Sequence, residues 1–138
     1  MNLSSPKLIF IVDDDPDDSQ FISDAFVENN KSFNYEFIRS ADQLLKELNK
    51  SDAVNPDLIL LDLNMPGAMG LQALKEIRSN KSFNQIPIIV ITTSSLEKDR
   101  AISYDYGANC FITKSHSYKK MITLAKAIID LWLIESHT

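Results

Sequence analysis

The stretch that could do chemistry is residues 57–70, DLILLDLNMPGAMG, which places Asp62 directly after an apolar run. The run lies between Pro56 and a Pro-Gly pair, a pattern typical of a short strand buried on both faces. An ionised carboxylate is costly to bury unless a cation, a donor or an open cleft lies beside it. In open parallel α/β sheets, ligands bind in the crevice beyond the carboxyl ends of the strands. The sequence therefore predicts that Asp62 is the centre of a ligand site.

Polar or charged side chains also follow three other apolar runs. They are Asp13 and Asp14 after residues 8–12, Thr92 and Thr93 after residues 86–91, and Lys114 after residues 110–113. If these runs are strands of one parallel sheet, their carboxyl ends meet at one edge. Three carboxylates, a hydroxyl and an ammonium would then converge there.

Such a site needs a cation, because two carboxylates about 4 Å apart repel by about 4 kcal/mol at an effective dielectric near 20. An all-oxygen, carboxylate-rich site suits Mg²⁺ or Mn²⁺. A carboxylate can also attack phosphorus to give an aspartyl phosphate. We therefore expect phosphoryl transfer to Asp62, with the metal, Lys114 and the Thr92 hydroxyl neutralising the phosphoryl oxygens.

Five apolar runs alternate with five helical patterns along the chain. The expected strands are residues 8–12, 35–38, 58–62, 86–91 and 110–113, and the expected helices are residues 16–29, 40–49, 71–80, 94–106 and 117–135. Asp15-Pro16 reads as an N-cap followed by proline, and Ser40/Gln43 and Ser94/Glu97 have capping-box spacing. The alternation predicts an α/β fold, a doubly wound five-stranded parallel sheet with five helices on its two faces.

Length and composition narrow the class of protein. The 138 residues suit one domain, with a core from about residue 7 to 135 and no separate output domain. The net charge of −5 argues against nucleic acid or an anionic membrane as partner. One cysteine cannot form an internal disulfide, and no signal-like or membrane-length apolar segment occurs. We expect a cytoplasmic chain.

In the residues that follow its predicted strands, the sequence resembles the receiver domains of two-component response regulators, the CheY-like family. The resemblance covers residues 8–135. It rests on Asp13-Asp14, on residues 61–67 with Gly70, on residues 92–94 and on residues 107–114. It implies the flavodoxin-like strand order 2-1-3-4-5 and a single receiver domain.

The resemblance also implies roles for the matched residues. Asp62 would be the phosphoacceptor. Asp14, Asp62 and the backbone carbonyl of Asn64 would bind Mg²⁺ directly, with Mn²⁺ able to substitute, and Asp13 would bind it through water. Thr92 and Lys114 would contact phosphoryl oxygens.

For signalling, the resemblance implies a sensor histidine kinase or a histidine phosphotransfer protein as phosphodonor. Thr92 and Phe111 would act as switch residues, with the aromatic ring turning inward. This would alter the face formed by the fourth helix, fifth strand and fifth helix, where a downstream protein or a second copy docks. The first helix and acidic loop also resemble single-domain regulators that partner phytochrome-type kinases.

Two departures from the family pattern affect the expected site. Ser115 follows Lys114 where the family has proline after a cis bond. The chain then either carries a cis bond without proline, at about 2.5–4 kcal/mol, or takes a trans path that re-aims the lysine. Phe111 replaces the commoner tyrosine, so the switch residue lacks a hydroxyl.

Two other functions use an acidic residue or a phosphate loop at corresponding positions of a similar fold. A phosphatase with an aspartyl nucleophile needs an acid two residues after Asp62, where the chain has Asn64. A flavodoxin-like cofactor binder needs a hydroxyl- and glycine-rich loop after the first strand, where the chain has aspartates. Apart from transferring and hydrolysing its own phosphoryl group, the chain is not expected to be an enzyme. Asp15, Asp17 and Asp18 are expected to form a solvated turn and helix start.

Overall fold

The computed structural model of the chain describes residues 6–65 and 69–133. Its strands are β1 (Leu8–Val12), β2 (Asn34–Ile38), β3 (Leu58–Leu61), β4 (Ile88–Thr92) and β5 (Cys110–Thr113). All neighbouring strands are parallel, in the order β2-β1-β3-β4-β5. The doubly wound parallel sheet and its strand order are therefore confirmed. The motif residues Pro66 and Gly67 lie outside the described residues.

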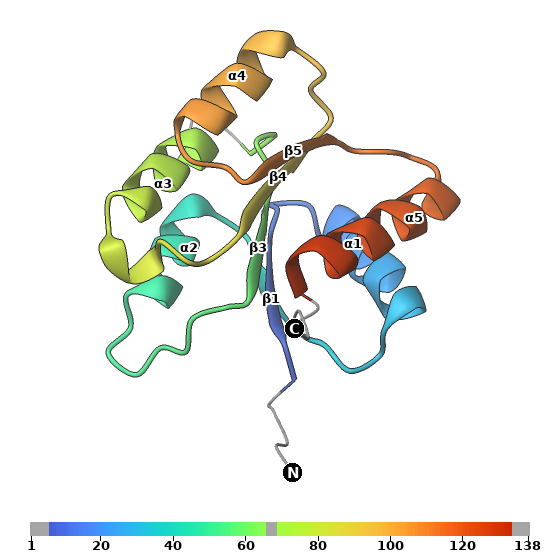
Figure 1. Ribbon diagram of the computed structural model, residues 1–138, viewed down its shortest axis with the longest axis horizontal. Coiled ribbons are helices and arrows are strands. Elements are labelled where there is room, and N and C mark those ends of the chain that lie inside the picture. The colour runs from blue at the N-terminus through green and yellow to red at the C-terminus, as the bar shows by residue number, and fades with distance from the viewer. Residues whose placement is uncertain (1–5, 66–68, 134–138) are drawn as a thin grey trace.

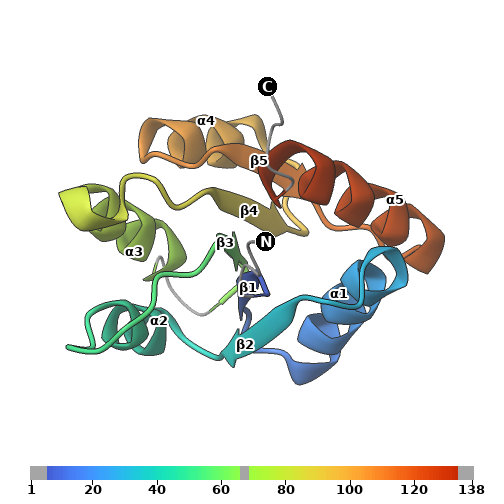
Figure 2. The ribbon, with the colours of Figure 1, turned by 60° about the horizontal axis from the view of Figure 1, so that its bottom comes forward.

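Helices cover both faces of this sheet (Figures 1 and 2). They are α1 (Pro16–Asn29), α2 (Ala41–Leu48), α3 (Met69–Arg78), α4 (Glu97–Asp105) and α5 (Tyr118–Ile128), with a 3-10 turn at Lys81–Phe83 and a π-helical turn at Ile129–Leu133. Helices α1 and α5 lie on one face, and α2, α3 and α4 lie on the other. No helix in the described part of the chain is long and apolar enough to cross a bilayer. The predicted end of the last helix, Glu135, lies outside that part.

Two hydrophobic layers form because successive side chains of a strand point to opposite faces. One layer, packed on α2 and α3, contains Phe10, Val12, Ile59, Leu61, Val90 and Phe111. The other, packed on α1 and α5, contains Ile9, Ile11, Leu58, Leu60, Ile89 and Ile91. All four residues of β3 are buried, as the unbroken apolar run predicted. The central strand is thus held on both sides, and its carboxyl end has a defined position.

The first two helices begin near the predicted residues. The carboxylate of Asp15 accepts a hydrogen bond from the Asp17 N–H (2.9 Å), and Pro16 opens α1. The Ser40 hydroxyl accepts from the Gln43 N–H (3.1 Å) at the start of α2. These caps satisfy donors that a helix N-terminus leaves unpaired.

The predicted capping box at Ser94 and Glu97 is wrong. Helix α4 begins at Glu97 with Leu96 in the N-cap position and no side-chain cap. The Ser94 hydroxyl instead donates to the Asp99 carboxylate (2.5 Å) and accepts from the Leu96 N–H (3.2 Å). Because Ser94 lies two residues before the N-cap position, its hydroxyl bonds the turn before α4 and cannot cap the helix.

One arginine side chain joins α3 to the segments on both sides of β4. The Arg78 guanidinium donates to the carbonyls of Gly107 (2.8 Å), Phe83 (3.0 Å) and Ile86 (2.8 Å) and to the side-chain oxygen of Asn109 (2.7 Å). Gly107 ends α4 with a φ of 106°, and a Cβ there would lie 2.5 Å from Cγ of Arg78. The glycine therefore permits both the turn and the close approach of the arginine.

We expect Arg78→Lys to lower the free energy of unfolding by about 2–4 kcal/mol, because one ammonium cannot reach four acceptors and buried carbonyls lose their partners. Urea denaturation followed by circular dichroism measures the change. Arg100→Lys, at an exposed position of α4, is the matched control. Equal stabilities of the two variants would contradict this account of Arg78.

Candidate functional site

The acidic cluster forms where β1 and β3 end. Val12 and Leu61 are partners in the parallel ladder, and the Asp62 N–H donates to the Val12 carbonyl (3.0 Å). The next residues, Asp13 and Asp62, therefore lie side by side, each 1% exposed.

With exposed Asp14, these residues fit a divalent cation. One carboxylate oxygen from each of Asp13, Asp14 and Asp62 can be chosen so that all three lie within 4.8 Å of one another. Hard cations such as Mg²⁺ and Mn²⁺ prefer oxygen ligands and retain waters, for which the exposed side of Asp14 leaves room. The Asn64 N–H donates to the Asp62 carboxylate (2.8 Å), so the Asn64 backbone lies beside the cluster. The structure thus brings together the residues predicted to hold the metal.

Lys114 reaches this cluster from the end of β5. Its ammonium lies 2.9 Å from the Asp13 carboxylate and 3.2 Å from the Asp62 carboxylate, and its side chain is 8% exposed. The Lys114 N–H donates to the Thr92 carbonyl (2.6 Å), which fixes the start of the side chain. The bond between Lys114 and Ser115 is not cis. The trans path, one of the two alternatives, therefore still directs the lysine into the cleft.

The interpretation of Asp18 as a merely solvated helix-start residue is wrong. Its carboxylate lies 2.9 Å from the Lys114 ammonium. The sequence could have indicated this position, because Asp18 precedes the inward-facing Ile22 and Ala25 by four and seven residues and so lies on the same face of the helix. Asp18 therefore starts the inner face of α1.

Asn64 holds the end of β4 through its side-chain oxygen, which accepts from the Thr92 hydroxyl (2.7 Å) and from the Thr93 N–H (2.8 Å) and hydroxyl (3.0 Å). The prediction had used only the Asn64 backbone carbonyl and missed this contact. Thr92 is fully buried and lies at the same edge as Asp62. To donate to a phosphoryl oxygen, the Thr92 hydroxyl must first give up its hydrogen bond to Asn64.

The ring of Phe111 is already inside the core, at 6% exposure. Its N–H donates to the Tyr104 hydroxyl (3.1 Å), which ties β5 to α4. A role for Phe111 as a switch stays a prediction.

Burial and the lysine act in opposite directions on the charge of the site. Burial raises the pKa of Asp62 to about 6, although the Asn64 N–H and the Lys114 ammonium favour its ionised form. Burial alone would lower the pKa of Lys114, but its hydrogen bonds to Asp18 and Asp13 and the charge of Asp62 raise it above its ordinary value. Lys114 is therefore charged across the neutral range, and the Asp62 carboxyl group ionises as the pH rises through about 6.

The structure thus places Asp62 between two other carboxylates and a lysine, at the carboxyl end of a doubly wound sheet. Residues 9–126 match the response regulator receiver domain family. The chain belongs to this family.

Similar proteins include single-domain and longer regulators. The response regulator Rcp1 of Synechocystis sp. is 34% identical over 134 residues, covering 93% of this chain and 90% of the relative. The transcriptional regulatory protein BaeR of Escherichia coli is 35% identical over 126 residues, covering 91% of this chain, which spans 49% of BaeR.

Two solved structures are close in fold. The phosphorylated cyanobacterial phytochrome response regulator RcpA has a TM-score of 0.85 at 34% identity, covering 96% of this chain and 97% of that one. The Mn²⁺-bound form of Rcp1 has a TM-score of 0.83 at 32% identity, covering 96% and 98%.

We expect Asp62→Asn to stabilise the metal-free fold by about 1–3 kcal/mol at pH 7.5. Burial raises the pKa of Asp62 from 3.8 to about 6, so the folded state favours the protonated carboxyl group. This preference stabilises the fold fully below pH 3.8, and the stabilisation is lost as the pH rises through about 6. The gain from Asn should therefore vanish near pH 4. Urea denaturation in EDTA across this range measures it.

Asp105→Asn, at the exposed end of α4, is the control and should show no such change between pH 4 and pH 7.5. A constant difference between Asp62→Asn and the unmodified chain over this range would contradict the assigned pKa.

Proposed function

We propose that the chain is phosphorylated on Asp62 by a sensor histidine kinase or a histidine phosphotransfer protein, in a reaction that needs Mg²⁺ and accepts Mn²⁺. One observation carries the proposal: the Asp62 carboxylate has the oxygens of Asp13 and Asp14 within 4.8 Å and the ammonium of Lys114 at 3.2 Å. This provides a nucleophile, oxygen ligands for a cation and a positive charge for phosphoryl oxygens. The Mn²⁺-bound form of the similar Rcp1 supports the choice of cation.

In the transfer step, an Asp62 oxygen attacks the phosphorus of a phosphohistidine. The new O–P bond forms as the N–P bond breaks, and the imidazole nitrogen keeps the electron pair. Asp13, Asp14, Asp62 and the Asn64 carbonyl would hold Mg²⁺, which neutralises charge on the phosphoryl oxygens when bound. Lys114 moves an N–H from a carboxylate to a phosphoryl oxygen. Hydrolysis by water then releases inorganic phosphate and restores the Asp62 carboxylate, so the chain acts as a self-catalysing switch.

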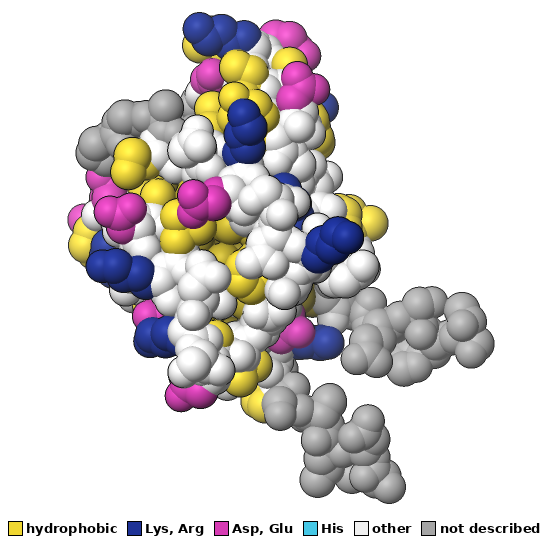
Figure 3. All heavy atoms as spheres, turned by 90° about the vertical axis from the view of Figure 1, so that its left-hand side faces the viewer, with side chains coloured by type: hydrophobic (Ala, Val, Ile, Leu, Met, Phe, Trp, Pro, Cys, Tyr) yellow, Lys and Arg dark blue, Asp and Glu magenta, His cyan; other side chains and the backbone are white. Residues whose placement is uncertain are grey.

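Phosphorylation would change the conformation of the face formed by α4, β5 and α5, and Thr92 would be the first residue to move. When the Thr92 hydroxyl leaves Asn64 for a phosphoryl oxygen, one of the three hydrogen bonds between Asn64 and the end of β4 is lost. The chain continues from this strand end into α4, so the loosened end of β4 could shift that helix. Leu96 at the N-cap of α4 (60%) and Tyr104 in the helix (40%) are exposed, and Figure 3 shows hydrophobic side chains there among charges of both signs. Such a mixed surface suits a regulated protein partner.

Partner docking or a homodimer through α4, β5 and α5 would provide the output. The similar RcpA, described as a cyanobacterial phytochrome response regulator, supports a phytochrome-type kinase as donor. The proposed location is the cytoplasm.

Acetyl phosphate with Mg²⁺ tests the proposal directly. Intact-mass spectrometry should show one added phosphoryl group, and the adduct should be absent in EDTA and in Asp62→Asn. Asp105→Asn, which removes a carboxylate from an exposed helix end, should be phosphorylated normally. An adduct that persists in Asp62→Asn, or steady turnover of p-nitrophenyl phosphate by the unmodified chain, would contradict the proposal.

A further inference from the structure

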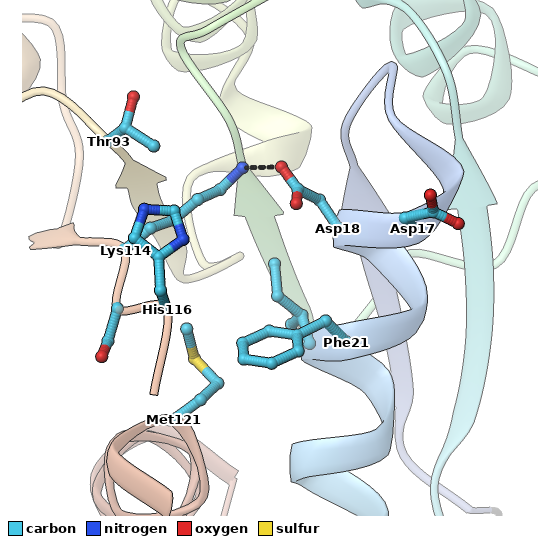
Figure 4. A pocket seen from close by; sticks show the side chains of 9 residues that line it. Asp17, Asp18, Phe21, Thr93, Lys114, His116 and Met121 are labelled. Carbon is cyan, nitrogen blue, oxygen red and sulfur yellow. Dashed lines mark hydrogen bonds and ion pairs between the residues drawn. The ribbon is translucent and has the colours of Figure 1, made fainter. Parts of the chain in front are cut away.

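The Lys114 ammonium is shared among three carboxylates, and one of them lies outside the metal cluster. It contacts Asp13 (2.9 Å), Asp62 (3.2 Å) and Asp18 (2.9 Å). An ammonium has three N–H donors, so all of them have partners in this state. Figure 4 shows Asp18 reaching towards Lys114 from α1, whereas Asp17, the next residue along the helix, points away.

A phosphoryl group on Asp62 would need one of these donors. Asp13 and Asp62 both belong to the carboxylate cluster that fits the cation. Asp18 is outside this cluster, so a bound cation would not be coordinated by its carboxylate. The Asp18 carboxylate would therefore stay available to the Lys114 ammonium. Asp18 and the phosphoryl oxygens therefore compete for the same ammonium.

We propose that Asp18 is a positioning residue that draws Lys114 towards α1 and thereby weakens the hold of the site on a phosphoryl group. This inference rests on the proposed function, because it concerns the phosphoryl-bound form of Asp62. Asp18 thus makes the switch easier to reset.

The surroundings of the Lys114–Asp18 ion pair allow it to break and re-form. The Asp18 side chain is 46% exposed, whereas that of Lys114 is 8% exposed. A pocket of 220 Å³, lined by both residues together with Thr93 and His116, opens beside the pair. Water in this space can solvate the Asp18 carboxylate when the lysine turns to a phosphoryl oxygen.

The size of the effect follows from this partial exposure. Exposed ion pairs contribute little to stability, and a pair with one buried partner contributes somewhat more. We therefore expect Asp18→Asn to tighten binding of a phosphoryl mimic by about three- to tenfold.

Isothermal titration of the chain with beryllium trifluoride in saturating Mg²⁺ measures this affinity. Asp18→Asn should bind about three- to tenfold more tightly than the unmodified chain, and Asp17→Asn, which removes an equal charge one residue away, should change affinity by less than about twofold. On a Lys114→Ala background, Asp18→Asn should have no effect, because the competition needs the lysine. Circular dichroism checks that each variant is folded.

The outcomes separate the two proposals. If the unmodified chain does not bind the mimic, the proposed function fails and this inference fails with it. If it binds but Asp18→Asn binds equally or more weakly, only the inference is overturned. A gain in Asp17→Asn as large as that in Asp18→Asn, or a gain that survives Lys114→Ala, would show a general charge effect and would also overturn it.

Discussion

The structure depends on one buried ammonium that balances carboxylates at the end of a sheet. Asp13 and Asp62 are almost fully buried and adjacent, and without a cation their repulsion would oppose folding. Lys114 contacts both and is itself nearly buried. Its single charge does not neutralise the cluster, which includes Asp14 as well. The remaining negative charge would favour the binding of a divalent cation in the cleft.

The pairing of the strands determines where these charged groups lie. Parallel pairing of β1 with β3 aligns Asp13 with Asp62, and parallel pairing of β4 with β5 brings the end of β5, from which Lys114 extends, beside Thr92. Two hydrophobic layers hold β3 on both faces, so Asp62 has little freedom to move. Beyond the strand ends, the Asn64 side chain joins the loop after β3 to the end of β4 through hydrogen bonds to Thr92 and Thr93.

Much of this could be predicted from the sequence, because parallel strands bring their carboxyl ends to one edge. Apolar runs located the strands, and the residues after them, such as Asp62 and Lys114, located the site. The directions of individual side chains could not be predicted this way. Ser94 bonds Asp99 instead of capping α4, and Asn64 turns its amide oxygen to Thr92, because tertiary contacts choose between several local partners. Asp18 was wrongly expected to be solvated, although its helical phase with Ile22 and Ala25 was enough to predict its place on the inner face of α1.

The most direct measurement of the central claim is a crystal structure with Mg²⁺ and beryllium trifluoride. The account predicts beryllium bonded to an Asp62 oxygen, the metal held by Asp14 and Asp62, and fluorine atoms within hydrogen-bond distance of the Lys114 ammonium and the Thr92 hydroxyl. A metal held elsewhere, or a Lys114 ammonium that stays away from the beryllium group, would contradict it.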